Sequence, residues 1–319
     1  MKLIGGEIEL KPELYSIYYT DSGRSSLRLI LKNLKGKTVA LPDFLCSIIV
    51  DVFNDENIKY FFYKVCPDLR IDISLISSAF DVLYIIDYFG VKHDYLGGQE
   101  LLKSKIIIED NVFSPFIENT ANFKNWISFN SYRKFSYCAE GSLIKSSFNM
   151  DSKDINPSFA NYIYSKYKAK EKKSFYLEDN TDITEMDYLN LFEEGDRLID
   201  KQKEIYSVSP KGYYFIQKYQ NEINSDISIR DNNFLILKKW LSPITELPYS
   251  FKSFFVFYTK ERDNLRRDLY NNNIFLPVHW PNILNIDNDL YKNLLSIPID
   301  SRYSEEEMQR ILLIVSKYC

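Results

Sequence analysis

Short apolar runs recur through the first half of this chain, and segments of helical or turn character separate them. Apolar runs of about four to eight residues are typical of strands buried on both faces of a parallel sheet. Parallel strands need crossover connections, which are usually helices. The pattern therefore predicts an α/β fold with a mostly parallel central sheet. We expect its strands at residues 38–41, 58–65, 82–87, 106–109, 126–129 and 142–145.

The helices expected around this sheet differ from those farther along the chain. Residues 22–34 and 47–53 carry apolar side chains at helical spacing and would cover the sheet. Long polar helices follow from about residue 165, and a final α+β unit begins near Pro243. We expect a large α/β domain at residues 1–235 and a small C-terminal α+β domain at residues 236–319. In the small domain we expect strands at 254–258 and 274–279 and helices at 261–271 and 304–318.

Composition limits the classes of function. A chain of 319 residues with 45% apolar content can bury a full core. Its net charge of −4 gives no general basic field, so nucleic acid is not an expected partner. No apolar run approaches the ~20 uncharged residues that span a bilayer, and the first residues lack the apolar core of a signal peptide. We therefore expect a cytoplasmic protein without membrane insertion. The four cysteines are scattered and there are only two histidines, so no metal site is expected.

Lys134 is the residue that points most directly to chemistry. Ser128 and Ser131 precede it by six and three residues, and the segment follows a predicted strand. A primary amine at the mouth of an α/β sheet can form a Schiff base with the aldehyde of pyridoxal phosphate, and nearby hydroxyl and N–H groups can hold the phosphate. A lysine after a strand is more often a solvated surface charge. The interpretation therefore depends on partners elsewhere in the chain.

Two other segments offer such partners. Gly23, Arg24 and Ser25 stand at the start of a predicted helix, where free N–H groups and the helix dipole attract anions. The alternative for this turn is an ordinary helix cap with an exposed arginine. Asp110 follows a predicted central strand, at the end where open α/β sheets bind ligands. Its carboxylate could pair with the protonated pyridine nitrogen of the cofactor, or it could be a helix cap or loop acid.

Together these segments resemble the DegT/StrS family of nucleotide-sugar aminotransferases. Residues 5–10, 22–27, 41–44, 87–90, 108–110 and 128–134 occur in the order seen in that family, and residues 262–265, 277–281 and 296–303 resemble its small domain. The resemblance covers nearly the whole chain. It implies a fold type I pyridoxal phosphate enzyme that forms a homodimer with two active sites at the subunit interface. It also implies transfer of an amino group from an amino acid such as glutamate to a nucleotide-linked keto sugar, in surface polysaccharide synthesis.

The resemblance also assigns roles by position. Lys134 would be the Schiff-base lysine and Asp110 the partner of the pyridine nitrogen. The phosphate ligands would be Gly23, Arg24 and Ser25, with Ser128 or Ser131 as a further ligand.

Residues near the C-terminal end are candidates for contact with the substrate. His279 could reach it from the cleft, or it could be a satisfied packing residue. Arg302 and Tyr303 could contact a sugar phosphate or a carboxylate, or they could fix the turn before the last helix. Arg230 could cross the dimer interface, with a helical surface charge as the alternative.

The chain departs from the family at four places. Phe113 stands where many members have glutamine or histidine, Arg24 replaces a hydroxyl residue, and Cys46 stands where an aromatic residue commonly stacks on the ring. The lysine loop is one residue longer, so Arg133 could occupy the position of the Schiff-base lysine, and a guanidinium cannot form that bond. These departures motivate a second hypothesis, a degenerate member that acts as a binding or scaffold protein. Lys134 itself argues against the histidine-type dehydratases of the family.

Overall fold

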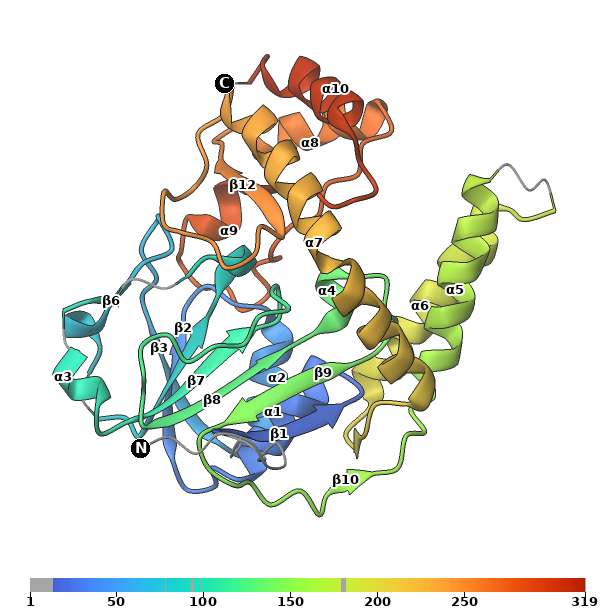
Figure 1. Ribbon diagram of the computed structural model, residues 1–319. Helices are drawn as coiled ribbons and strands as arrows, with labels where there is room; N and C mark the ends of the chain where they lie inside the picture. The colour runs from blue at the N-terminus through green and yellow to red at the C-terminus, as the bar shows by residue number, and fades with distance from the viewer. Residues whose placement is uncertain (1–13, 78, 93–94, 98, 179–181, 319) are drawn as a thin grey trace, which may run out of the picture.

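The computed structural model describes residues 14–77, 79–92, 95–97, 99–178 and 182–318 (Figure 1). Its centre is a seven-stranded sheet. The strands lie in the order β1 (Ser16–Thr20), β9 (Ser142–Ser146), β8 (Asn125–Asn130), β7 (Ile106–Asn111), β5 (Val82–Ile86), β2 (Thr38–Pro42) and β3 (Lys59–Tyr63). The predicted α/β fold is confirmed. The family-like segment at residues 5–10 lies outside the described residues.

The sheet is parallel except at one edge. Strands β8, β7, β5, β2 and β3 run parallel to one another, whereas β9 is antiparallel to both β8 and β1. All six predicted strands are present and the sheet is mostly parallel, as expected. The antiparallel direction of β9 was not predicted. Residues 131–141 connect β8 to β9, and this connection is shorter than the dozen or more residues that a parallel crossover needs. Strand β1 is not among the predicted strands.

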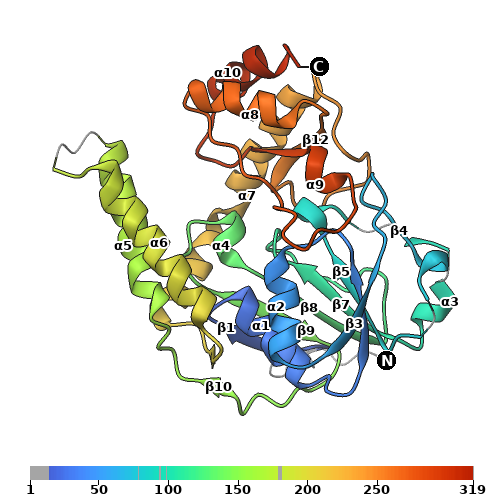
Figure 2. The same cartoon turned by 180° about the vertical axis from the view of Figure 1, so that it is seen from behind.

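Helices α1 (Gly23–Lys32) and α2 (Ser47–Asp55) lie on one face of the sheet (Figure 2). Ser22 caps α1, because its Oγ accepts a hydrogen bond from the N–H of Ser25 at 3.2 Å. Residues 25–31 of α1 are all buried. The start of α1 is therefore held rigidly against the sheet.

Two helices, α5 (Tyr162–Leu177) and α6 (Glu185–Lys201), pack side by side and project from the body as an arm. Both views show the α5–α6 arm standing away from the sheet (Figures 1 and 2). A small apolar cluster of Ala160, Tyr162 and Ile199 closes its base. The predicted long polar helices are confirmed.

Helix α7 (Pro210–Lys238) runs from the base of the arm to the C-terminal region of the chain (Figure 1). It passes through the predicted domain boundary at residue 235 without a break. Its last turns contribute Phe234, Ile236 and Leu237 to a second apolar core. The other elements of that core are β12 (Phe254–Tyr258), β13 (Leu294–Pro298), α8 (Arg262–Asn271) and α10 (Glu305–Val315).

The strand predicted at residues 274–279 is wrong. These residues form no strand, and β12 pairs antiparallel with β13 instead. Asn273 adopts a left-handed backbone with φ of 57° and turns the chain. Pro277 lacks the N–H that a strand ladder needs. Helix α10 begins as predicted, because Ser304 and Glu307 form a capping box.

The remaining elements are short. They are β4 (Ile71–Asp72), β6 (Tyr95–Leu96), α3 (Gln99–Leu102), α4 (Tyr132–Phe135), β10 (Ile155–Asn156), β11 (Ile205–Tyr206), α9 (Leu290–Asn293) and two single 3₁₀ turns. The C-terminal region packs on the sheet domain through Tyr291, whose hydroxyl bonds the backbone of Leu45 and Asp43. Within the described ranges, no helix is both long and apolar enough to cross a membrane.

Candidate active site

A cavity of about 340 Å³ lies where the sheet, the start of α1 and the segment after β8 meet. This volume falls in the range of about 300–1,000 Å³ that small-molecule sites occupy. Several segments that are far apart in the sequence supply its walls. They include Ser22, Gly23, Arg24, Cys46, Tyr84, Ile86, Asp110, Val112, Phe129, Ser131, Arg133, Lys134, Asp196 and Trp280.

Asp110 reaches the cavity because of its place in β7. In the sheet register Asp110 lies opposite Ile86 of β5 and Phe129 of β8, and neighbouring residues in register share one face. Asp110 Oδ2 accepts a hydrogen bond of 2.6 Å from the Tyr84 hydroxyl, and Oδ1 accepts one of 3.1 Å from the N–H of Val112. Burial raises the pKa of Asp110 to about 6, although both hydrogen bonds and the nearby charge of Lys134 oppose the rise.

Lys134 lies on α4, the four-residue helix that follows Ser131. Its Nζ is 5.5 Å from the centre of the Phe113 ring. Burial lowers the pKa of Lys134; Cys46 and Asp110 act in the opposite direction, and Arg133 acts in the same direction. A lowered pKa increases the fraction of neutral amine, which is the nucleophilic form.

The start of α1 forms another corner of the cavity. A Cβ atom added to Gly23 would come 3.3 Å from the Cβ of Ser131, so the glycine allows the helix start and the Ser131 turn to approach closely. The first N–H groups of a helix have no partner within the helix. Ser22, Gly23 and Ser131 therefore place hydroxyl and N–H donors together, as an anion site requires.

Two arginines on the rim are paired with acids of the arm. Arg24 forms an ion pair of 2.6 Å with Asp200, and Arg133 lies 3.8 Å from Asp196. The Arg133 guanidinium also lies over the ring of Tyr162 at 5.4 Å. The Arg133 side chain thus contacts the arm, whereas Lys134 is the cation that interacts with Asp110.

Ser128 and Ser25 do not line the cavity. Ser128 lies opposite Glu109, one residue before Asp110, and therefore on the other face of the sheet. Its hydroxyl bonds the carbonyl of Glu109 and the side chain of Asn111. Ser25 is turned into the helix cap, where its hydroxyl bonds that of Ser22 at 3.2 Å.

The three predicted substrate residues lie apart from this cavity. His279 packs edge-on against Phe113 and Phe254, and its Nδ1 is 3.0 Å from the Ser296 hydroxyl. Burial, and then the charge of Lys134, lower the pKa of His279 to about 3, so its ring is neutral.

Arg302 and Tyr303 lie at the end of the segment after β13. Arg302 is held by Asp300 through bonds of 2.6 and 2.8 Å, and its side chain is 64% exposed. Tyr303 lies under the Arg302 guanidinium and packs against the second apolar core.

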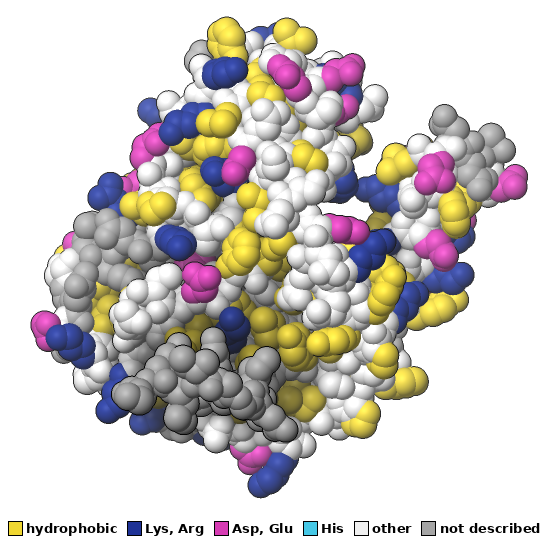
Figure 3. Space-filling view, viewed as in Figure 1, with side chains coloured by type: hydrophobic (Ala, Val, Ile, Leu, Met, Phe, Trp, Pro, Cys, Tyr) yellow, Lys and Arg dark blue, Asp and Glu magenta, His cyan; other side chains and the backbone are white. Residues whose placement is uncertain are grey.

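Arg302 borders a second cavity of about 550 Å³, which also includes Lys134. This second cavity lies between the arm, α4, α7 and the segment before α10. Its cations include Lys170 and Lys173 of α5. The space-filling view shows a notch between the arm and the C-terminal region, with Lys and Arg side chains gathered at it (Figure 3).

Arg230 is buried within the chain, with 3% of its surface exposed, so it is not the helical surface charge considered from the sequence. It bonds residues of its own chain, namely Asp226, Phe135, Lys252 and Ser253. Burial of an arginine on a long polar helix has no signature in the apolar pattern of the sequence.

Tyr84, Trp280 and the acids of α6 were not predicted as site residues from the sequence. Tyr84 is the one polar side chain in the otherwise aliphatic strand β5, and that placement is a usable signal. Trp280 closes one wall of the cavity from the C-terminal region, beside the buried ring of Phe44. Asp196 could not have been found, because nothing local indicates that the last turns of α6 border the site.

The donors around the first cavity fit pyridoxal phosphate. Lys134 supplies an amine, Asp110 an acid for the pyridine nitrogen, and the corner of Ser22, Gly23 and Ser131 a site for the phosphate. Asp110 lies on the sheet face and the phosphate corner at the helix start, so the two ends of the cofactor have separate partners.

The solved structures most similar in fold include sugar aminotransferases. DesV of S. venezuelae, solved with a ketimine intermediate, has a TM-score of 0.64 at 13% identity over 95% of this chain and 84% of its own. A DegT DnrJ EryC1 StrS aminotransferase from Brucella abortus has a TM-score of 0.61 at 13% identity over 95% and 85%. DesI, solved with its TDP-sugar product, has a TM-score of 0.65 at 10% identity over 94% and 79%.

The TM-scores and the coverage establish likeness of fold, and at these low identities of fold alone. The predicted fold type I architecture is confirmed. Comparison of the sequence with protein-family models gives no match, and comparison with curated proteins gives none either.

Proposed function

We propose that this chain, which has the fold of the sugar aminotransferases, is a pyridoxal phosphate-dependent aminotransferase that acts on a keto sugar. The observation that carries the proposal is the first cavity, which brings together Lys134, Asp110 and the start of α1. Each of these residues was a candidate on sequence grounds alone. Their meeting in one cavity of suitable size is more specific than any one of them.

Pyridoxal phosphate, when bound, supplies an electron sink for the carbanion formed at the α-carbon of an amino acid. Lys134 would hold the cofactor through Nζ and, once released, would take the α-proton on the same atom. The lowered pKa of Lys134 suits both roles, because each needs the neutral amine. Asp110 would face the pyridine nitrogen, and its carboxylate, fixed by Tyr84, would keep a proton on that nitrogen.

The phosphate would lie at the corner formed by Ser22, Gly23 and Ser131. Arg24 stands beside this corner, and its ion pair with Asp200 holds the guanidinium at the rim. Trp280 and the aliphatic side chains of α2 would exclude water from the ring.

The finer points of the proposal concern the substrates. We take glutamate as the amino donor and a nucleotide-linked keto sugar as the acceptor, in surface polysaccharide synthesis in the cytoplasm. The neighbour DesI, solved with a TDP-sugar product, supports the class of acceptor. The second cavity supports it too, because it adjoins Lys134 and carries basic side chains.

We also propose a homodimer. The α5–α6 arm stands away from the body and carries exposed apolar side chains that a second copy could cover. They include Phe175 (44% exposed), Leu177 (69%), Met186 (59%) and Leu189 (43%). Light scattering of the purified protein tests this: a mass of one chain contradicts the homodimer.

The test of the activity begins with colour. The protein should turn yellow with pyridoxal phosphate, and borohydride should fix the cofactor on the peptide that contains Lys134. Lys134→Ala should lose both properties. Lys134→Arg is the matched control, because it keeps the positive charge but cannot form the covalent bond. Covalent trapping at another residue in either variant would reject the assignment.

The alternative is a scaffold protein with this fold. It is favoured by Phe113, a fully buried ring beside Lys134 where the resembling family commonly has a polar side chain. One absorbance titration with pyridoxal phosphate distinguishes the two functions. An aminotransferase should change its absorbance with pyridoxal phosphate and again when glutamate is added, whereas a scaffold should show neither change.

A further inference from the structure

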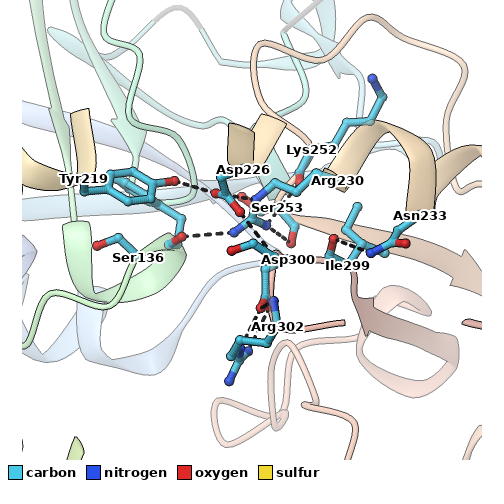
Figure 4. Close-up of polar contacts among 12 residues, drawn as sticks. Ser136, Tyr219, Asp226, Arg230, Asn233, Lys252, Ser253, Ile299, Asp300 and Arg302 are labelled. Carbon is cyan, nitrogen blue, oxygen red and sulfur yellow. Dashed lines mark hydrogen bonds and ion pairs between the residues drawn. The ribbon is translucent and has the colours of Figure 1, made fainter. Parts of the chain in front are cut away.

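Arg230 of α7 uses its whole guanidinium inside the protein (Figure 4). Nε donates to Asp226 at 2.9 Å, and Nη1 donates to the carbonyls of Ser253 at 3.0 Å and Lys252 at 3.3 Å. Nη2 donates to the carbonyl of Phe135 at 3.0 Å. The guanidinium also lies 4.6 Å from the centre of the Phe251 ring.

The bond to Phe135 connects Arg230 to the amine of the site. Phe135 is the last residue of α4 and directly follows Lys134. The carbonyl groups at the end of a helix lack partners within it, and a helix of four residues has no interior turn to hold it in place. A cation at that end both caps the free carbonyl and suits the helix dipole. A residue of α7 thus caps the end of α4.

Asp226 connects the same group to the C-terminal region. Its Oδ2 accepts hydrogen bonds from Arg230 and from the Tyr219 hydroxyl, the latter at 2.7 Å. Its Oδ1 accepts one of 3.2 Å from the N–H of Ser301. Asp226 and Arg230 are both nearly fully buried, at 6% and 3% exposed.

A buried ion pair is weak evidence for a contribution to stability, since apolar residues of similar size are often as good. This pair does, however, link separate segments of the chain. Its bonds join the end of α4, the segment before β12 and the segment after β13, which are distant in sequence. Asp226, Arg230 and Lys134 all border the second cavity.

We propose that the Asp226–Arg230 pair is a positioning device. It fixes α4 so that the Lys134 amine stays between the two cavities, and it links the position of the amine to that of the C-terminal region. Its importance for catalysis rests on the proposed function, but the placement of the amine does not. Loss of the pair would let α4 loosen and would expose the amine to water.

The titration of Lys134 measures that placement directly. Bound pyridoxal phosphate is first removed with hydroxylamine, and the protein is labelled with trace acetic anhydride between pH 6 and pH 10. Mass spectrometry then gives the labelling of the Lys134 peptide relative to Lys218, an exposed lysine of α7. Because burial lowers the pKa of Lys134 in the intact protein, exposure should raise it.

Two variants separate position from charge. Arg230→Lys keeps the charge but cannot hold Asp226 and cap Phe135 together, so the pKa of Lys134 should rise. Asp226→Asn removes a negative charge, which by electrostatics alone would lower the pKa of Lys134, whereas loosening of α4 raises it. Lys238→Met breaks an exposed ion pair on the same helix and should leave the titration unchanged.

A rise of the Lys134 pKa in Arg230→Lys and Asp226→Asn supports the proposal. An unchanged pKa in Arg230→Lys, or a fall in Asp226→Asn, overturns it. If Asp226→Asn does not fold, Arg230→Lys decides. Failure of both to fold, judged by circular dichroism, also overturns it, because the pair would then serve the fold as a whole. Absorbance with pyridoxal phosphate is recorded separately, so failure of the proposed function is seen independently of the labelling.

Discussion

Replacing Asp110 by asparagine should make the cofactor-free protein more stable. Asp110 lies on the sheet face with its carboxylate buried, and burial raises its pKa to about 6 from the ordinary 3.8. Asparagine has nearly the same shape and needs no charge. Its amide oxygen can accept from the N–H of Val112, and its NH₂ can donate to the Tyr84 oxygen, so both present contacts have a replacement.

The magnitude follows from linkage between ionisation and folding. The folded state holds the Asp110 proton more tightly than the unfolded state, so this group stabilises the folded chain fully only below about pH 3.8. That contribution is lost as the pH rises to about 6. At about 1.36 kcal/mol for each pKa unit, the loss is about 1.6 kcal/mol at pH 5 and about 3 kcal/mol at pH 8. Asp110→Asn should recover these amounts.

Urea denaturation of both proteins at pH 5 and pH 8, without cofactor, provides the comparison. The difference between the two proteins reports Asp110 together with its attraction to Lys134, whose pKa Asp110 raises. A variant that is equally or less stable at pH 8 would refute the reasoning. So would a difference that does not grow between pH 5 and pH 8, since attraction to Lys134 would then outweigh burial.

The same substitution should act in the opposite direction on the cofactor. If Asp110 faces the pyridine nitrogen, asparagine cannot supply the negative charge that keeps it protonated. We expect weaker binding of pyridoxal phosphate by the more stable variant. A destabilised chain that also binds poorly would point to damage to the fold rather than to a functional cost.

Three further substitutions test single features of the site and the fold. Tyr84→Phe removes a hydrogen bond to a charged group, which is worth about 1.5–3 kcal/mol. The pKa of Asp110, followed by carboxyl NMR, should therefore rise by about one to two units, and an unchanged pKa contradicts the contact. Gly23→Ala adds a methyl 3.3 Å from the Cβ of Ser131 and should weaken binding of pyridoxal phosphate in a fluorescence titration. Equal affinity would mean that the phosphate binds elsewhere. Ser304→Ala removes a capping box and should cost about 1 kcal/mol in urea denaturation, whereas no loss would mean that packing alone holds α10.

Local sequence signals were sufficient for the main residues of the candidate site. Lys134 follows a strand, Asp110 lies next to the last residue of one, and Gly23 begins a helix, and each of these relations is visible within a few residues. The apolar runs located the strands because parallel strands are buried on both faces. The meeting of the three residues then follows from the topology of an open α/β sheet, whose ligands bind where the strands end.

The face of a strand on which a residue lies is harder to predict in such a sheet. Ser128 and Asp110 both looked suitable as ligands, but they are on opposite faces, because Ser128 pairs with Glu109. In a strand buried on both faces the apolar pattern does not alternate, so nothing in the sequence distinguishes inward from outward positions. The register with the neighbouring strand places Ser128 on the face opposite Asp110 and so excludes it as a ligand in the cavity.

The C-terminal region was hardest for a related reason. The partner of β12 could not be chosen locally, and residues 294–298 lie farther away than the segment we expected.

The buried face of helix α7 could not be predicted locally either. Asp226, Arg230, Asn233, Phe234 and Leu237 succeed one another by four, three, one and three residues and form one buried stripe. Three of the five are polar, so a search for apolar periodicity passes over the stripe, and the spacing of Asp226 and Arg230 is typical of an exposed helical ion pair. A sequence can therefore show that two charges are neighbours while the rest of the fold determines that they are buried, and in this protein that burial is what connects α7 to the lysine.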